Sequence, residues 1–264
     1  MLRHTIGLIG IMLLSLISLA HADPWPFAAQ QLTATLGEVA ANRYPHYAAS
    51  AWTVTDATAW TSGFFPGTLW TMYDHTGDPM WRAEAESQQA AIESQKTRTN
   101  THDLGFMFFP SYVNAYRLTG HDPYRQVALT AAGNLATRFK PAVGVIHTAW
   151  PGSATGEVKT IIDIMVNLEL LFWASANGGN PTWANQAHSH ALRTAAEHVR
   201  PDGSTYHVVT YDASNGTVKS KGTAQGYNAE STWARGQACS LHGFALAHQT
   251  TRLNEGETYA FLRT

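Results

Sequence analysis

The stretch from Thr160 to Ala174, T-I-I-D-I-M-V-N-L-E-L-L-F-W-A, constrains the fold of this chain more than any other part of it. Ten of its fifteen residues are large and apolar, and a segment that is apolar on nearly every side is predicted to be a buried helix. Asp163 lies near its start, with Asn167 four residues later on the same helical face. Burying a carboxyl is unfavourable unless it is hydrogen-bonded, paired or protonated, and a carboxyl with a raised pKa is suited to general acid catalysis.

Composition excludes several classes of partner. The chain has 264 residues, of which 44% are hydrophobic and 14% charged, enough for the core of one large domain. Its formal net charge of −2 gives no electrostatic basis for binding nucleic acid or an acidic membrane. Nine Trp, ten Tyr and ten Phe suit a core of large helices, and they also suit a cleft that stacks on sugar rings.

The N-terminus has the features of a signal peptide. Arg3 and His4 precede an apolar run at 6–19, and Ala20-His21-Ala22 has the small-x-small pattern of a cleavage site. We expect cleavage after Ala22, a mature domain at 23–264, and export to a periplasm or to the outside with no membrane attachment.

Cofactor motifs are missing from the sequence. No Gly-rich phosphate loop follows a predicted strand, and Cys239 is the only cysteine, which leaves neither a Cys cluster nor an intrachain disulfide. His188 and His190 are close in sequence, but residues two apart point to different faces of a helix. We therefore expect no metal and no organic cofactor.

Apolar helices alternate with Ala-rich amphipathic ones. Thr76-Gly77-Asp78-Pro79 and Thr119-Gly120-His121-Asp122-Pro123 each end an apolar helix, 43 residues apart. Helix pairs repeated at such a period indicate a solenoid or a closed ring, here an all-α barrel or toroid with buried inner and amphipathic outer helices. The predicted helices cover about 27–43, the latter part of 61–76, 80–95, 104–118, 124–139, 160–174, 182–199, a part of 224–249 and 255–264, with a loop at 44–60 and a short strand at 204–211.

The loops that enter the inner helices share one end of such a barrel. Trp60, His102, Asp103, Trp150 and Asp163 lie in or beside these loops. The pattern therefore predicts a site at this end.

Six short motifs resemble one known family. They occur in a fixed order from about residue 25 to the last residue: W-T-S-G-F-F-P-G at 60–67, T-H-D-L-G-F-M at 101–107, I-I-D-I-M-V-N-L at 161–168, S-T-Y-H-V at 204–208, Q-G-Y at 225–227 and S-T-W-A-R-G-Q-A at 231–238. Together they resemble the unsaturated glucuronyl hydrolases of glycoside hydrolase family 88.

The resemblance implies an (α/α)6 barrel, of the six-hairpin glycosidase type, that works without a metal or an organic cofactor. It implies a hydrolase that removes the terminal 4,5-unsaturated uronic acid from oligosaccharides made by polysaccharide lyases. In this family an aspartic acid protonates C4 of the C4=C5 enol ether and helps deliver water to C5, and the resulting hemiketal rearranges and releases the remaining sugar. The partner would therefore be an unsaturated uronic-acid oligosaccharide.

The resemblance also gives the catalytic residues. Asp163 matches the catalytic acid and base, in agreement with its predicted burial; the alternative is a structural carboxyl that caps the helix or pairs with Asn167. Asp103 matches the second carboxylate, which would stay ionised and hold ring hydroxyls. Its alternative role is to cap the helix that starts at Leu104.

The remaining site residues would bind substrate. Arg235 is predicted to be buried and to pair with the substrate carboxylate, or alternatively with a protein carboxylate such as Glu230. The other matched positions are two histidines and an amide, His102, His207 and Gln225, and three indoles that either stack on sugar or pack in the core, Trp60, Trp150 and Trp233.

The chain departs from the family pattern at Cys239, where the family has Trp, and at His242, where it has Tyr. The smaller Cys239 would remove an aromatic wall of the uronate pocket, and we expect it to be a buried hydrophobic residue rather than a nucleophile.

The chain is also short for a six-hairpin barrel. About nine of the twelve helices are predicted, and the last residues, T-Y-A-F-L-R-T, end within a helix pattern. We expect the barrel to be incomplete at its C-terminus. This leaves two alternatives to the hydrolase: a related (α/α)6 hydrolase that acts on unsaturated rhamnogalacturonan, and a non-catalytic sugar-binding remnant. The sequence does not predict the oligomeric state.

Overall fold

The computed structural model describes residues 23–148 and 154–255. The predicted signal peptide at 1–22, Trp150 and the residues after Glu255 lie outside these ranges. Helices form most of the fold: α1 (Pro24–Glu38), α2 (Phe64–Thr76), α3 (Pro79–Gln89), the 3-10 helix η1 (Ala90–Thr97), α4 (Leu104–Phe108), the π-helix η2 (Phe109–Val113), α5 (Asn114–Thr119), α6 (Asp122–Ala136), α7 (Ile164–Ala176), α8 (Thr182–His198) and α9 (Ala234–Glu255).

The turns between paired helices form as their sequence predicts. α2 and α5 both end at a glycine in the left-handed region, Gly77 and Gly120, each with φ of 68°. Glycine adopts this conformation without the steric penalty of a side chain. After the first turn, the Asp78 carboxylate accepts a hydrogen bond from the Met80 backbone N–H at 2.9 Å and so caps α3.

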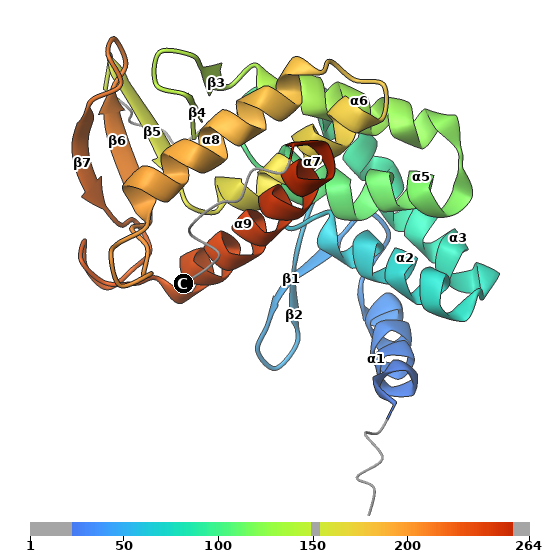
Figure 1. The fold of residues 1–264 in the computed structure, drawn as a ribbon. Coiled ribbons are helices and arrows are strands. Elements are labelled where there is room, and N and C mark those ends of the chain that lie inside the picture. The colour runs from blue at the N-terminus through green and yellow to red at the C-terminus, as the bar shows by residue number, and fades with distance from the viewer. Residues whose placement is uncertain (1–22, 149–153, 256–264) are drawn as a thin grey trace, which may run out of the picture.

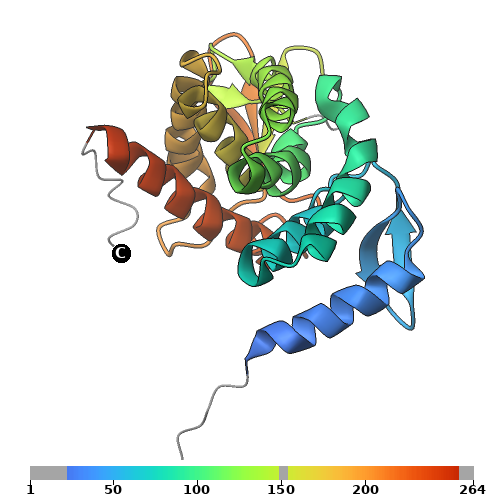
Figure 2. The ribbon, with the colours of Figure 1, turned by 90° about the vertical axis from the view of Figure 1, so that its right-hand side faces the viewer.

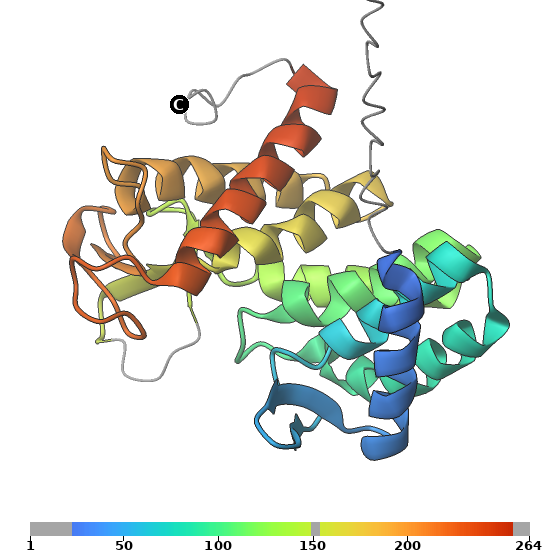
Figure 3. The same cartoon turned by 90° about the horizontal axis from the view of Figure 1, so that it is seen from below.

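α7 lies at the centre of the helical layers. It packs against α4, α6, α8 and α9, and α9 crosses it in Figures 1 and 3. Most of its side chains are buried, including those of Leu168, Leu170 and Leu171. The prediction of a buried helix is therefore confirmed over 164–174.

The start of this stretch differs from the prediction. Thr160 and Ile161 belong to strand β5 (Glu157–Ile161), and the helix begins only at Ile164, directly after Asp163. The β-branched run Thr160-Ile161 pairs instead with Val209 and Val208 of a neighbouring strand, where such side chains pack well.

Strands supplement the predicted helical architecture. β5, β6 (Val208–Asp212) and β7 (Val218–Gly222) form an antiparallel sheet in that order. The predicted strand at 204–211 thus begins later, at Val208. β7 was not predicted, although Asn215-Gly216, with Gly216 at φ of 72°, is a typical hairpin turn between β6 and β7.

The N-terminal part of the chain differs from the prediction in two places. The first helix ends at Glu38 rather than near residue 43, and β1 (Tyr44–Ala48) pairs with β2 (Trp52–Thr55) where a loop was expected. Figures 2 and 3 show this hairpin beside α1 at one edge of the molecule, and Figures 1 and 3 place the three-stranded sheet at the opposite side. A further short pair, β3 (Phe139–Lys140) and β4 (Val145–Ile146), follows α6.

Close helix contacts depend on residues without a side chain. A Cβ atom added at Gly105 of α4 would lie 2.6 Å from the backbone O of Asn167 in α7, and the Asn167 Oδ1 accepts a 2.9 Å hydrogen bond from the Phe106 backbone N–H. At Gly243 of α9, an added Cβ would lie 2.5 Å from the Met165 Cβ. Glycine therefore allows both α4 and α9 to approach α7. Within the described ranges, no helix combines the length and apolarity needed to cross a bilayer.

Gly105→Ala should destabilise the protein by about 1–3 kcal/mol, because the new methyl group overlaps the α7 backbone, which cannot move aside freely. Gly37→Ala is the matched control, since nothing lies within 4 Å of an added Cβ there and alanine favours the helix. Urea unfolding followed by far-ultraviolet circular dichroism measures both effects. Equal midpoints for the two variants would contradict the close contact of α4 with α7.

Candidate active site

Two carboxyls occupy equivalent places on neighbouring inner helices. Asp103 directly precedes α4 and Asp163 directly precedes α7, and these two helices pack against each other. The contact of Gly105 and Phe106 with Asn167 fixes the two helix starts relative to each other. The structure thus brings together the two residues predicted to be catalytic.

Asp163 is a partly buried acid whose carboxyl has one unpartnered oxygen. Its Oδ1 is buried and has no hydrogen-bond partner among the described residues. Burial, and after it the charge of Asp103, raise the pKa of this carboxyl from 3.8 to about 6, against the opposing effects of its own backbone N–H and of Arg235. Its side chain makes no capping hydrogen bond, and the Asn167 Oδ1 is bonded to Phe106. Neither structural alternative for Asp163 is therefore supported.

Asp103 is held by side chains rather than by the helix it precedes. The Thr101 hydroxyl donates to Asp103 Oδ2 at 3.0 Å, and His102 Nε2 lies 3.3 Å from Asp103 Oδ1. The carboxylate makes no capping hydrogen bond to α4. The alternative that Asp103 serves only as a helix cap is therefore wrong, and Thr101 and His102 hold its carboxyl beside Asp163.

The His102 imidazole is neutral, and in this form it supports the Asp103 carboxyl. Burial lowers the pKa of the imidazole, although Asp103 opposes this effect. The Thr148 hydroxyl lies 3.3 Å from His102 Nδ1. Since Nε2 faces the carboxylate, Nε2 carries the proton and Nδ1 accepts from Thr148. Sequence reasoning missed Thr101 and Thr148, although a hydroxyl two residues before Asp103 is a typical local turn signal.

Arg235 lies between two indole rings. Its guanidinium carbon is 4.9 Å from the ring centre of Trp60 and 4.6 Å from that of Trp233, and its Nη2 donates to Gln225 Oε1 at 2.6 Å. The prediction that Arg235 is buried is wrong, since the residue is exposed. No carboxylate among the described residues forms an ion pair with it, and Glu230 accepts instead from the Tyr206 hydroxyl at 3.3 Å. Its cation is thus oriented by aromatic faces and an amide, and its charge is available to an anion.

The His207 imidazole packs against the indole of Trp233. The two rings stack with centres 4.2 Å apart at 28°. The backbone N–H groups of Ala224 and Gln225 point at His207 Nδ1, at 3.2 and 3.4 Å, so this nitrogen is an acceptor and the proton lies on Nε2. Burial, with a smaller effect of Arg235, lowers the pKa of His207 to about 4, so the ring is a neutral donor at neutral pH.

Trp60 and Cys239 complete the described part of the site. Trp60 is half-buried, with its ring centre 5.3 Å from that of Phe106, so it packs on the core and still presents a face to Arg235. Cys239 is half-buried, and burial followed by the charge of Asp163 raises the pKa of its thiol to about 11. Cys239 is therefore less buried than expected, and its neutral thiol agrees with the expectation that it is not a nucleophile. It lies close enough to Asp163 for the charge of that carboxyl to affect its pKa.

No set of three His, Cys, Asp or Glu side chains within residues 23–148 and 154–255 has the arrangement of a metal site. His190 has a structural role, because its Nδ1 accepts from the Ile146 backbone N–H at 2.9 Å.

Known proteins resemble this chain over most of its length. It is 38% identical to an unsaturated glucuronyl hydrolase of Formosa agariphila over 196 residues, which are 73% of this chain and 48% of that protein. It is 36% identical to the unsaturated glucuronyl hydrolase of Bacillus sp. strain GL1 over 211 residues, 78% of this chain and 56% of that protein. No protein-family model matches the sequence.

Comparison with solved structures gives the same relatives. A crystal structure of an unsaturated glucuronyl hydrolase specific for heparin superposes with a TM-score of 0.84 at 37% identity, over 90% of this chain and 63% of that one. The structure of the Bacillus sp. GL1 enzyme gives 0.79 at 32% identity, over 91% and 63%. The chain belongs to the unsaturated glucuronyl hydrolase family. The prediction of an (α/α)6 barrel is confirmed, and the chain spans about half the length of the curated relatives it matches.

The stability of this unsaturated glucuronyl hydrolase homologue should depend on the titration of Asp163. A pKa raised from 3.8 to about 6 means that the folded state binds the proton more tightly, so the stabilisation is complete below about pH 4 and lost as the pH rises through about 6. This pKa difference corresponds to a stabilisation of the folded state by about 3 kcal/mol. Asp163→Asn should remove it, so wild type loses about this much stability relative to the variant between pH 4 and 8.

Urea titrations of both proteins across this pH range measure the difference, in which the contributions of the buried histidines cancel. Asp103→Asn should reduce the loss, because it removes the charge that adds to the effect of burial. Parallel stability profiles for wild type and Asp163→Asn would contradict a buried, protonated Asp163.

Proposed function

We propose that this protein is a hydrolase that removes the terminal 4,5-unsaturated uronic acid from oligosaccharides produced by polysaccharide lyases. The proposal rests on one observation. Asp163 is an acid with a buried, unpartnered oxygen and a pKa of about 6, and the charges of Asp103 and Arg235 both affect this pKa. Such a group is protonated over much of the acidic to neutral range and can donate a proton to a weakly basic carbon.

The reaction is a hydration. Asp163 donates its proton to C4 of the C4=C5 bond, and the positive charge that develops is shared between C5 and the ring oxygen. Water adds to C5, and its proton returns to the Asp163 carboxylate. The C5 hemiketal then opens to a ketone, and the hemiacetal left at C1 collapses to an aldehyde and releases the remaining sugar. One water molecule is consumed, and Asp163 ends in its starting state.

Asp103 supports this step through its charge. Its negative charge raises the pKa of Asp163 and keeps the proton available, and the same charge stabilises the cation that develops at C5. Thr101 and neutral His102 occupy the hydrogen-bonding positions that keep this carboxylate in place.

Arg235 recognises the uronate carboxylate. Its guanidinium contacts the ring faces of Trp60 and Trp233, and Nη2 donates to Gln225. Its other N–H donors remain for a bidentate contact. Trp233, stacked on His207, provides an apolar ring face beside this cation, where a sugar ring can pack.

Asp163→Asn should lower the rate of this hydrolysis by at least about 100-fold, since general acid catalysis contributes about 10²–10⁴-fold. Loss of the ultraviolet absorbance of the C4=C5 double bond in unsaturated disaccharides measures the rate. Glu169→Gln is the matched control: Glu169 is another carboxyl of α7 whose pKa burial raises, to about 7, but it is not part of the site.

Chondroitin-derived, heparin-derived and rhamnogalacturonan-derived unsaturated disaccharides should be compared, since the ranking identifies the preferred glycan. A near wild-type rate for Asp163→Asn would refute the assigned acid. No loss of absorbance with any unsaturated uronide would refute the hydrolase and leave a sugar-binding protein.

We also propose that the protein is exported and that residues 1–22 are removed. The charged start, the apolar run and Ala20-His21-Ala22 support this. N-terminal sequencing of the protein recovered from outside the cytoplasm should begin at Asp23. A protein that retains Met1 after export would refute cleavage.

A further inference from the structure

Asp103 lies in a loop whose position α4 alone does not fix. The segment 98–103 connects η1 to α4, and its Thr101 hydroxyl donates to Asp103 Oδ2 at 3.0 Å. The contact of Gly105 with Asn167 fixes the start of α4, but the Asp103 carboxyl makes no capping hydrogen bond to that helix. The position of this carboxyl therefore depends on what holds the loop.

Arg138, which lies between α6 and β3, holds this loop. Its Nη1 donates to the Thr99 backbone O at 2.6 Å. Its Nε donates to the His147 backbone O at 2.8 Å, and its own backbone O accepts from the His147 N–H at 3.0 Å. One residue thus binds both backbone polar groups of His147 and joins them to the loop of Asp103.

The segment at His147 is bonded in turn to the strand that leads into Asp163. The Thr148 N–H donates to the Lys159 backbone O at 2.8 Å, and the Lys159 N–H donates to His147 Nδ1 at 3.1 Å. Lys159 belongs to β5, which ends two residues before Asp163. The Thr148 hydroxyl also lies 3.3 Å from His102 Nδ1. Arg138 therefore belongs to a continuous set of hydrogen bonds between the two loops that carry the candidate catalytic carboxyls.

The chemistry of Arg138 suits this connecting role. The residue is half-buried, and it forms no ion pair with any carboxylate of residues 23–148 and 154–255. Burial lowers the pKa of its guanidinium and the charge of Asp103 opposes this effect, so the cation lies within the field of that carboxyl. A guanidinium holds its donors in a rigid planar fork and can therefore bind two carbonyls at once.

We propose that Arg138 is a positioning residue for the hydrolysis: its guanidinium joins the loop of Asp103 to the segment bonded to β5, and so fixes the separation of the Asp103 and Asp163 carboxyls. The proposal rests on the proposed function, because it concerns the same two carboxyls. Arg138 acts through Asp103, and the groups that contact Arg235 lie outside both loops, so the binding of the uronate should not depend on it.

The pKa of Asp163 reports the position of Asp103. The charges that act on this pKa are those of Asp103, before α4, and Arg235, on α9. Cys239 of α9 is a further titratable group in the field of Asp163, and its thiol is neutral. Neither Arg138 nor any described group of α6 or α8 contributes to this pKa. A changed pKa in an Arg138 variant would therefore reflect a moved neighbour and not the loss of the arginine's own charge.

Arg138→Lys keeps the positive charge but not the planar fork. An ammonium group cannot hold both carbonyls in this geometry, so we expect the loop to relax and Asp103 to move away from the like charge of Asp163. The pKa of Asp163 should then fall by about half a unit or more, since a like charge at close range contributes shifts of at least this size. Arg138→Ala should give at least the same shift.

Urea titrations across pH 4–8 measure this pKa, as the stability difference between each Arg138 variant and the same variant with Asp163→Asn. Because the raised pKa of Asp163 stabilises the folded state at low pH, a smaller rise means that the loss of stability is smaller and occurs at a lower pH than in wild type. An unchanged midpoint in Arg138→Lys would overturn the proposal.

Kinetics give a second measure. With an unsaturated disaccharide as substrate, Arg138→Lys should lower kcat by about tenfold or more and leave KM within about twofold, because a misplaced catalytic group slows the chemical step while the uronate site is intact. A raised KM with an unchanged kcat would contradict a role through the carboxyls.

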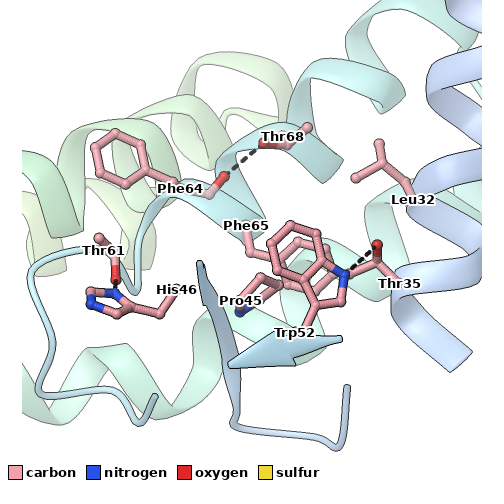
Figure 4. A pocket seen from close by; sticks show the side chains of 9 residues that line it. All are labelled: Leu32, Thr35, Pro45, His46, Trp52, Thr61, Phe64, Phe65 and Thr68. Atoms are coloured by element: carbon pink, nitrogen blue, oxygen red, sulfur yellow. Dashed lines mark hydrogen bonds between the residues drawn. The ribbon is translucent and has the colours of Figure 1, made fainter. Parts of the chain in front are cut away.

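Two controls separate positioning from a general loss of stability. Arg125→Lys is the matched one, because Arg125 also lies on α6 and its Nη1 donates to the Asn177 backbone O at 2.8 Å, at the other end of α7. Thr35→Val removes the acceptor of the Trp52 indole N–H, 3.3 Å away beside the cavity between α1 and the β1–β2 hairpin (Figure 4). Both variants should leave the midpoint of the Asp163 titration unchanged, and an equal shift in either one would refute the specific role of Arg138.

The stability measurement needs no substrate, so it is independent of the catalytic proposal. A shifted midpoint without hydrolysis of any unsaturated uronide would refute the hydrolase and retain Arg138 as the residue that spaces the two carboxyls. An unshifted midpoint in an active enzyme would refute the positioning role and leave the hydrolase in place.

Discussion

The approach of α4 to α7 is the contact on which the candidate site depends. Because Gly105 has no side chain, the two helices come close enough for Asn167 Oδ1 to accept a hydrogen bond from the Phe106 backbone N–H inside α4. A side-chain amide bonded to a backbone of another helix fixes axial register as well as distance. As a consequence, Asp103 and Asp163, each one residue before its helix, lie at the same end of the barrel.

The electrostatic balance at Asp163 follows from this placement. The start of a helix favours a carboxylate, and Arg235 adds a positive charge on the same side. Burial and the charge of Asp103 nevertheless outweigh both, and the pKa rises to about 6. His102 and His207 do not disturb this balance, because burial keeps both rings neutral. The pKa of Asp163 is therefore set first by burial, then by the charge of Asp103, with Arg235 as a smaller opposing effect.

The sequence predicted the helices and the carboxyls better than the strands and the exposure of the arginine. Helical periodicity is local, and it identified α7 and the turns at Gly77 and Gly120. The pairing of β5 with β6, about fifty residues later, is non-local, and an apolar run such as Thr160–Ile162 suits a strand or a helix until its partner is known. Arg235 was predicted to be buried because it lies in an apolar motif, but its helix presents that position to the indoles of Trp60 and Trp233 at the surface.

The aromatic residues around Arg235 explain how an exposed guanidinium can bind a carboxylate specifically. A guanidinium in water is mobile and strongly screened. Between two indoles it loses rotational freedom before any ligand arrives, so less entropy is lost when a carboxylate binds. The hydrogen bond to Gln225 and the two indole faces thus fix the orientation of a cation that is otherwise exposed to solvent.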